Sequence, residues 1–138
     1  MNIEVVEVLD KELVEFIDKK LNEFNFARWD VKEVKPLAVK VTGEKGEVVA
    51  GSSARTFGNW MLLDTLWVSD EMRAHGLGSR ILAQMEASAK NRGCKFVLLD
   101  TLNFQARPFY EKHGYQVQWT QNFYPKTGCK YFMVKELS

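Results

Sequence analysis

The sequence has little of what marks a secreted, membrane-spanning or nucleic-acid-binding protein. Its two cysteines, Cys94 and Cys129, lie far apart, so they form neither a disulfide framework nor a paired zinc motif. Lysine and arginine (19) nearly balance aspartate and glutamate (18), which leaves no excess positive charge to hold a nucleic acid. No apolar run reaches membrane-spanning length, and the N-terminus has no signal-peptide pattern. These absences predict a cytoplasmic protein with reduced thiols and no membrane or nucleic-acid partner.

The apolar residues that are present suffice for one domain. The 138 residues are 46% hydrophobic and 27% charged. This length and balance suit one full core and no second domain, so we expect a single domain over residues 1–138. No group of His, Cys and carboxylate residues has metal-ligand spacing, and we expect no metal.

Hydrophobic periodicity predicts a strand, a helix and a strand meander in the first half of the chain. Ile3 to Val8 alternates apolar and polar residues like a half-buried strand. Asp10 can cap the helix that follows, whose apolar residues recur every three or four positions. Three strand-like runs separated by glycine-containing turns then predict an antiparallel meander: Leu37 to Val41, Val48 to Ser53 and Trp60 to Val68.

The second half predicts two helices, a buried strand and a closing hairpin. A helix extends from Ser79 to Arg92, and Gly93 can end it. Phe96 to Leu99 is almost wholly apolar, as expected for a central strand. A short helix begins near Pro108, and the hairpin strands lie around Tyr115 to Trp119 and Tyr131 to Lys135. This order predicts an α+β fold with a largely antiparallel sheet and one parallel junction.

A glycine-containing loop joins the strand that ends at Val68 to the helix at Ser79. Its pattern is Arg73-x-x-Gly76-x-Gly78. The first amides of a helix have no intrahelical partners and lie at the positive end of the dipole, so they can bind a pyrophosphate. The loop lacks the lysine of a Walker loop and the third glycine of a dinucleotide fingerprint. The spacing fits a phosphate-binding loop of another kind, or an ordinary turn that binds nothing.

Three motifs together make the chain resemble the GNAT superfamily of acyl-CoA-dependent N-acyltransferases over nearly its whole length. They occur in the family's order: Leu66-Trp67-Val68 resembles the end of its fourth strand, Arg73-x-x-Gly76-x-Gly78 its pyrophosphate loop, and Asn103 through Tyr110 to Gly114 its C-terminal cofactor motif. The resemblance implies an α+β, three-layer fold. It has a mixed, largely antiparallel twisted sheet of about seven strands flanked by helices, with the fourth and fifth strands splayed at a parallel junction.

The resemblance also implies acetyl-CoA as the acyl-donor cosubstrate. The pantetheine arm would lie between the splayed strands and pair with backbone groups of Leu66 and Val68. The diphosphate would bind the loop amides, with charge added by Arg73 or Arg80, and Asn103 would reach the cofactor from the opposite wall. The expected cofactor-binding residues are Leu66, Trp67, Val68, Arg73, Ala74, His75, Gly76, Leu77, Gly78, Ser79 and Asn103.

Tyr110 and Asp64 are the expected catalytic residues. Tyr110 lies where family members place a tyrosine near the coenzyme A sulfur, so its phenol could protonate the departing thiolate; the alternative is a core tyrosine bonded to a backbone carbonyl. Asp64 interrupts an apolar strand where polyamine-acetylating relatives carry a general base. The alternatives for Asp64 are a solvent-facing position or a partner for Arg55 or Arg28. Asp100 is the second-choice carboxylate.

We therefore expect an acetyl-CoA-dependent N-acetyltransferase that acetylates a primary amine of a small molecule by direct attack in a ternary complex. Two alternatives are a protein lysine or N-terminal acetyltransferase and a non-catalytic acyl-CoA-sensing module. Apolar residues near Trp119 and Phe123 could form a homodimer surface.

Overall fold

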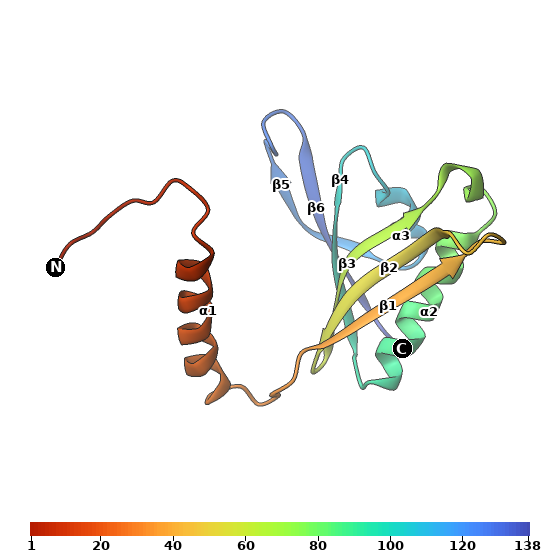
Figure 1. Ribbon diagram of the computed structural model, residues 1–138. Helices are drawn as coiled ribbons and strands as arrows, with labels where there is room; N and C mark the ends of the chain where they lie inside the picture. Colours follow the sequence, from red (N-terminus) through yellow and green to blue (C-terminus); the bar gives the residue numbers. More distant parts are fainter. The chain divides into compact units, whose positions relative to one another are not determined.

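The first 32 residues contain one helix and form a unit of their own. The computed structural model describes all 138 residues, and the chain divides into two units, Met1–Lys32 and Glu33–Ser138. Helix α1 (Lys11–Phe26) begins as predicted, because the Asp10 carboxylate accepts a hydrogen bond from the Leu13 amide at 2.9 Å (Figure 1). None of its residues is buried.

The predicted strand over Ile3 to Val8 is wrong, since these residues form neither a helix nor a strand. Alternation of apolar and acidic side chains is compatible with any extended segment. A strand also needs backbone hydrogen bonds to a neighbouring strand, and this segment makes none.

The second unit is built on a six-stranded sheet (Figure 1). Its strands follow the spatial order β1-β2-β3-β4-β6-β5, and every neighbouring pair is antiparallel except β3 and β4, which are parallel. The bounds are β1 (Lys35–Thr42), β2 (Val48–Phe57), β3 (Trp60–Val68), β4 (Phe96–Leu102), β5 (Gln116–Asn122) and β6 (Cys129–Glu136). The largely antiparallel sheet with one parallel junction is confirmed. There are six strands and not about seven, because no strand forms before α1.

One 3-10 turn and two helices complete this unit. A single 3-10 turn, η1 (Asp70–Met72), leads to α2 (Leu77–Asn91), and α3 (Arg107–Lys112) follows β4. Helix α2 ends where Gly93 adopts a φ of +92°, as the sequence predicted. None of the helices combines the length and apolar composition needed to cross a bilayer.

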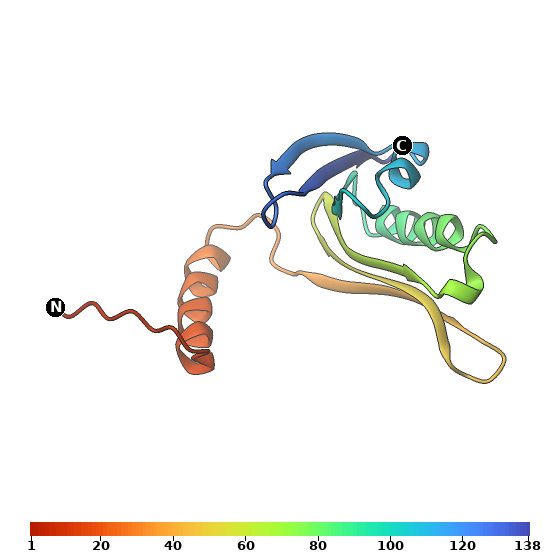
Figure 2. The same ribbon diagram turned by 90° about the horizontal axis from the view of Figure 1, so that it is seen from above.

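Helices α2 and α3 pack on the same face of the sheet (Figure 2). Tyr110 of α3 shares one buried cluster with α2 and with the strands, whose contributing residues include Ala54, Met61, Leu63, Val97 and Leu99. Side chains alternate along a strand, so Leu62, Leu98 and Asp100 lie on the opposite face. No helix of this unit contributes to the core from that face.

Candidate functional site

Strands β3 and β4 separate after a short paired stretch, and the gap between them is the candidate site. They pair only from Trp60 with Phe96 to Leu62 with Leu98. Beyond this point β3 continues to Val68 and β4 to Leu102 without pairing with each other. The backbone groups on the facing edges are therefore available to an extended ligand. This is the splayed parallel junction that the sequence predicted.

An inner hollow of about 240 Å³ occupies the start of this gap. Both strands line it, together with the segment before α3 and Tyr110. Its lining comprises Leu63, Asp64, Thr65, Leu66, Leu99, Asp100, Thr101, Gln105, Ala106 and Tyr110.

A β-bulge in β3 shapes the wall of the inner hollow. Ser53 of β2 pairs with Thr65 and Ala54 pairs with Leu63, so Asp64 is the extra residue without a partner across the strands. Thr65 is held by Ser52, whose hydroxyl donates to its carbonyl at 2.6 Å, and by Ser53, whose amide donates to its hydroxyl at 3.0 Å. These bonds hold β3 to β2 directly after the bulge at Asp64.

An outer hollow of about 780 Å³ adjoins the inner one, because the two share Leu66, Gln105 and Ala106. Its lining includes most of the predicted cofactor-binding residues: Leu66, Trp67, Val68, Arg73, Ala74, Gly76, Leu77, Gly78 and Ser79. Glycine at position 78 leaves the space in front of the Phe109 ring open, since a Cβ there would lie 3.5 Å from that ring.

The loop before α2 presents a row of unused amides to the outer hollow. Ala74 and Gly76 have φ angles of +66° and +71°, in the left-handed region. The first hydrogen bond of α2 runs from the Arg80 amide to the Gly76 carbonyl at 3.1 Å, and no amide from Ala74 to Ser79 donates within the chain. Such a concave row of donors at a helix start fits an anionic diphosphate.

Two cationic side chains border the outer hollow, and they differ in what they contact. Arg73 forms an exposed ion pair with Asp70 at 3.1 Å and donates to the Val68 carbonyl at 3.2 Å. The Val68 carbonyl, one of the backbone groups expected to pair with the pantetheine arm, therefore already accepts one hydrogen bond. Lys112 lines the hollow without any hydrogen bond or ion pair, whereas Arg80 is not part of the lining.

His75 and Asn103 do not line either hollow, although the sequence placed both at the cofactor. The Asn103 side chain accepts a hydrogen bond from the Cys129 amide at 3.2 Å. It lies in a separate hollow at the β5–β6 hairpin. In this structure its contacts stabilise the hairpin.

Tyr110 is a buried residue of the inner hollow whose hydroxyl has no partner within the chain. Its side chain is 7% exposed, and its hydroxyl makes no hydrogen bond, so it is not the carbonyl-bonded core tyrosine considered above. No fully buried side-chain oxygen or nitrogen lacks a partner, so the hydroxyl opens into the hollow. Burial raises the pKa of Tyr110 to about 12, with a further contribution from the negative charge of Asp100.

Asp64 lines the inner hollow but is also paired. Its carboxylate accepts two hydrogen bonds from Arg55 of β2, from Nε at 3.2 Å and from Nη2 at 3.1 Å. Of the alternatives considered for Asp64, the ion pair with Arg55 is therefore present. Both side chains are about half exposed.

Sequence reasoning missed several residues of α3 and the segment before it. Gln105, Phe109 and Lys112 all line the hollows. The centroids of the His113 and Phe109 rings lie 4.8 Å apart, and His113 contacts the Ser79 hydroxyl at 2.9 Å, which connects the end of α3 to the start of α2. The sequence contained a signal for these residues: Phe109 and Lys112 lie one turn apart on the short helix predicted to begin near Pro108.

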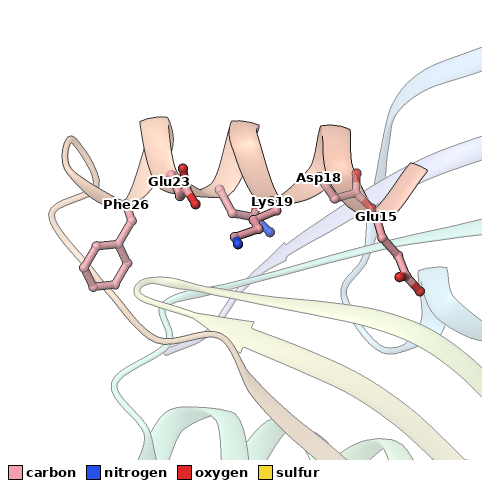
Figure 3. A pocket seen from close by; sticks show the side chains of 6 residues that line it. Glu15, Asp18, Lys19, Glu23 and Phe26 are labelled. Carbon is pink, nitrogen blue, oxygen red and sulfur yellow. The ribbon is translucent and has the colours of Figure 1, made fainter. Parts of the chain in front are cut away.

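A further hollow lies along α1 and does not resemble a reaction site. It is lined by residues of that helix alone, and Figure 3 shows the charged side chains of Glu15, Asp18, Lys19 and Glu23 along it, with Phe26 at the end. A single helix cannot surround a ligand, so the gap between β3 and β4 is the candidate site.

Comparisons with known proteins agree with this geometry. Residues 4–115 match the acetyltransferase (GNAT) family. A blasticidin-S acetyltransferase of Streptomyces morookaense is 38% identical over 114 residues, which cover 80% of this chain and 84% of that protein. An acetyltransferase of Agrobacterium fabrum is 30% identical over 115 residues, covering 83% of this chain and 84% of that protein. The crystal structure of an acetyltransferase from Bacillus cereus superposes with a TM-score of 0.87 at 29% identity, covering 97% of this chain and 98% of that one.

Proposed function

Because the chain belongs to the acetyltransferase (GNAT) family and is an acyltransferase, we propose that it transfers an acetyl group from acetyl-CoA to a primary amine of a small molecule. The observation that carries this proposal is the gap between β3 and β4. It leads from the unused amides of the loop before α2 to the unpaired hydroxyl of Tyr110. The loop suits a diphosphate, the free strand edges suit the pantetheine arm, and the inner hollow suits the thioester.

We propose direct attack in a ternary complex. The amine nitrogen forms a bond to the thioester carbonyl carbon, the carbon–sulfur bond breaks, the nitrogen loses a proton and the sulfur gains one. A ping-pong route would need a reactive cysteine. Cys94 is buried in the core, and burial raises the pKa of its thiol, which is the opposite of what a nucleophile needs.

Tyr110 acts in this scheme as the hydrogen-bond donor nearest the leaving sulfur. With a pKa of about 12 the phenol stays protonated at neutral pH. Full proton transfer to a thiolate whose conjugate acid has a pKa of about 8.5 is uphill, so the main effect of Tyr110 is a hydrogen bond to the developing negative charge, and the thiolate takes its proton from water. Asp64 or water takes the proton of the amine.

The small-molecule acceptor is supported by the relative named for blasticidin S, which is 38% identical to this chain. The family match from residue 4 to residue 115 spans both units, which supports one functional domain over the chain. The free thiols Cys94 and Cys129 suit the reducing cytoplasm.

Trp119 and Phe123 of the β5–β6 hairpin are 59% and 83% exposed, and we keep them as the surface of the proposed homodimer. Sedimentation of the wild-type chain and of a Trp119→Ser, Phe123→Ser double variant tests it. The double variant should sediment as a monomer.

The decisive experiment measures free-thiol release from acetyl-CoA with a panel of acceptors. The panel contains blasticidin S, polyamines, aminoglycosides, amino acids, and lysine and N-terminal peptides. Saturable release with a small-molecule amine supports the proposal. Release with peptides alone would indicate a protein acetyltransferase, and acetyl-CoA binding without release to any acceptor would indicate a sensing module.

A further inference from the structure

Two carboxylates occupy equivalent positions where β3 and β4 separate. The last paired residues are Leu62 of β3 and Leu98 of β4, and Asp64 and Asp100 each follow two positions later. Both line the inner hollow. Equivalent positions and equal charge would predict equal roles, but the contacts of the two residues differ.

Asp64 already has a positively charged partner. Arg55 donates two hydrogen bonds to its carboxylate, in the two-point geometry that arginine and carboxylate favour. A cationic ligand would have to displace or share this guanidinium. The charge of Asp64 is thus largely balanced within the chain.

Asp100 has no such partner. Its carboxylate makes no hydrogen bond and no ion pair, and its negative charge is the second cause, after burial, of the raised pKa of Tyr110. The unpaired hydroxyl of Tyr110 opens into the same hollow, although the rest of that residue is buried. A ligand bound in this hollow can therefore supply a partner to both the Asp100 carboxylate and the Tyr110 hydroxyl.

The geometry points to Asp100 as the residue that binds a positively charged group of the acceptor and so selects it; this inference rests on the proposed acyl transfer. The reacting amine must be neutral to attack, and a carboxylate bound to it would hold it protonated. The cation bound by Asp100 is therefore a second group of the acceptor. The favoured substrates are small molecules that carry an ammonium or guanidinium group beside the primary amine to be acetylated.

Calorimetric titration in the presence of saturating coenzyme A tests this without requiring acetyl transfer. The probes are 4-amino-1-butanol, which carries one ammonium group at neutral pH, and 1,4-butanediol, which has a hydroxyl in its place and no charge. The wild-type chain should bind the amino alcohol about 10- to 100-fold more tightly, the range typical of a hydrogen bond to a charged group. Asp100→Asn should abolish this preference, and Asp100→Glu, which keeps the charge, should retain most of it.

Glu111→Gln is the control, because this carboxylate of α3 lines neither hollow, and it should retain the preference. Asp64→Asn, at the proposed base, tests whether the paired carboxylate selects the cation instead of Asp100. Unchanged coenzyme A affinity in each variant shows that the fold is intact. The inference is overturned if the wild-type chain binds both probes equally, if Asp100→Asn keeps the preference, or if Asp64→Asn removes it. If the preference depends on Asp100 but no amine is acetylated in the thiol-release assay, the acyl-transfer proposal fails and the cation site stands.

Discussion

The two halves of the β3–β4 pair serve different purposes although they belong to the same strands. Where the strands pair, their side chains are apolar, and the rings of Trp60 and Phe96 stack with centroids 4.8 Å apart. Where they separate, aspartates and threonines line a hollow. The closed half stabilises the sheet, and the open half leaves polar groups unsatisfied that a substrate can use.

Two tyrosines show the same contrast. The Tyr115 hydroxyl donates to the Glu86 carboxylate at 2.8 Å, and Lys135 pairs with the same carboxylate at 2.8 Å. The Tyr110 ring lies 5.6 Å from the Tyr115 ring, yet its hydroxyl has no partner. The Tyr115 hydroxyl is used within the core, whereas the Tyr110 hydroxyl opens into the inner hollow and is available to a bound ligand.

The largest effect expected in the closed half is a loss of stability. Met61 is fully buried, so Met61→Ala should lower the free energy of unfolding by about 2–5 kcal/mol through lost burial and the cavity left behind. Leu66→Ala in the open half removes a half-buried side chain that lines both hollows. It should cost less stability and raise the KM for acetyl-CoA. Urea unfolding and steady-state kinetics on both variants check this, and equal losses of stability would contradict the distinction.

Tyr110→Phe should reduce kcat about 100-fold, the scale of a lost hydrogen-bond donor to the developing negative charge, with little change in acetyl-CoA affinity or stability. Tyr115→Phe should do the reverse. It removes a hydrogen bond to a charged group and should cost about 1–3 kcal/mol of stability while kcat stays near the wild-type value. Kinetics and unfolding of the two variants side by side test the pair. Unchanged turnover in Tyr110→Phe would remove its assigned role.

Local sequence signals predicted most of the fold. The Asp10 cap, the Gly93 stop and the apolar run at Phe96 to Leu99 each depend on neighbouring residues only, and the structure contains all three. The strand expected over Ile3 to Val8 failed because a strand depends on a partner elsewhere in the chain. Pattern alone does not provide that partner.

The sequence motifs identified the part of the candidate site that they contain. The loop around Gly76, expected to bind the diphosphate, lines the outer hollow. The pairing of Asp64 with Arg55 depends on strand register and on a bulge, and the contact of Asn103 with Cys129 joins residues 26 positions apart. Such long-range contacts determine which polar groups are free, so the sequence did not reveal that Asp64 is paired and Asp100 is not.

The raised pKa of Tyr110 predicts a loss of stability at alkaline pH. Its pKa is about 12 in the folded chain and about 10 when unfolded, so its contribution is complete below pH 10 and is lost as the pH rises toward 12. Between pH 9 and pH 11 Tyr110 should account for a loss of about 1 kcal/mol. Tyr110→Phe should lose that much less than the wild-type chain in urea unfolding at the two pH values. An identical loss in both would show that the phenol titrates normally.

The smallest effect is expected for the ion pair at the mouth of the open half. Arg55 and Asp64 are 52% and 42% exposed, and pairs of this kind contribute about 0–1 kcal/mol because water and salt screen them. Arg55→Gln should therefore change the free energy of unfolding by less than about 1 kcal/mol, and 0.5 M NaCl should reduce even that difference. A double-mutant cycle with Asp64→Asn measures the pairing energy. If the ion pair instead contributes several kcal/mol to the free energy of unfolding, Asp64 stabilises the fold. It would then belong with the closed half of the β3–β4 pair and not with the open half.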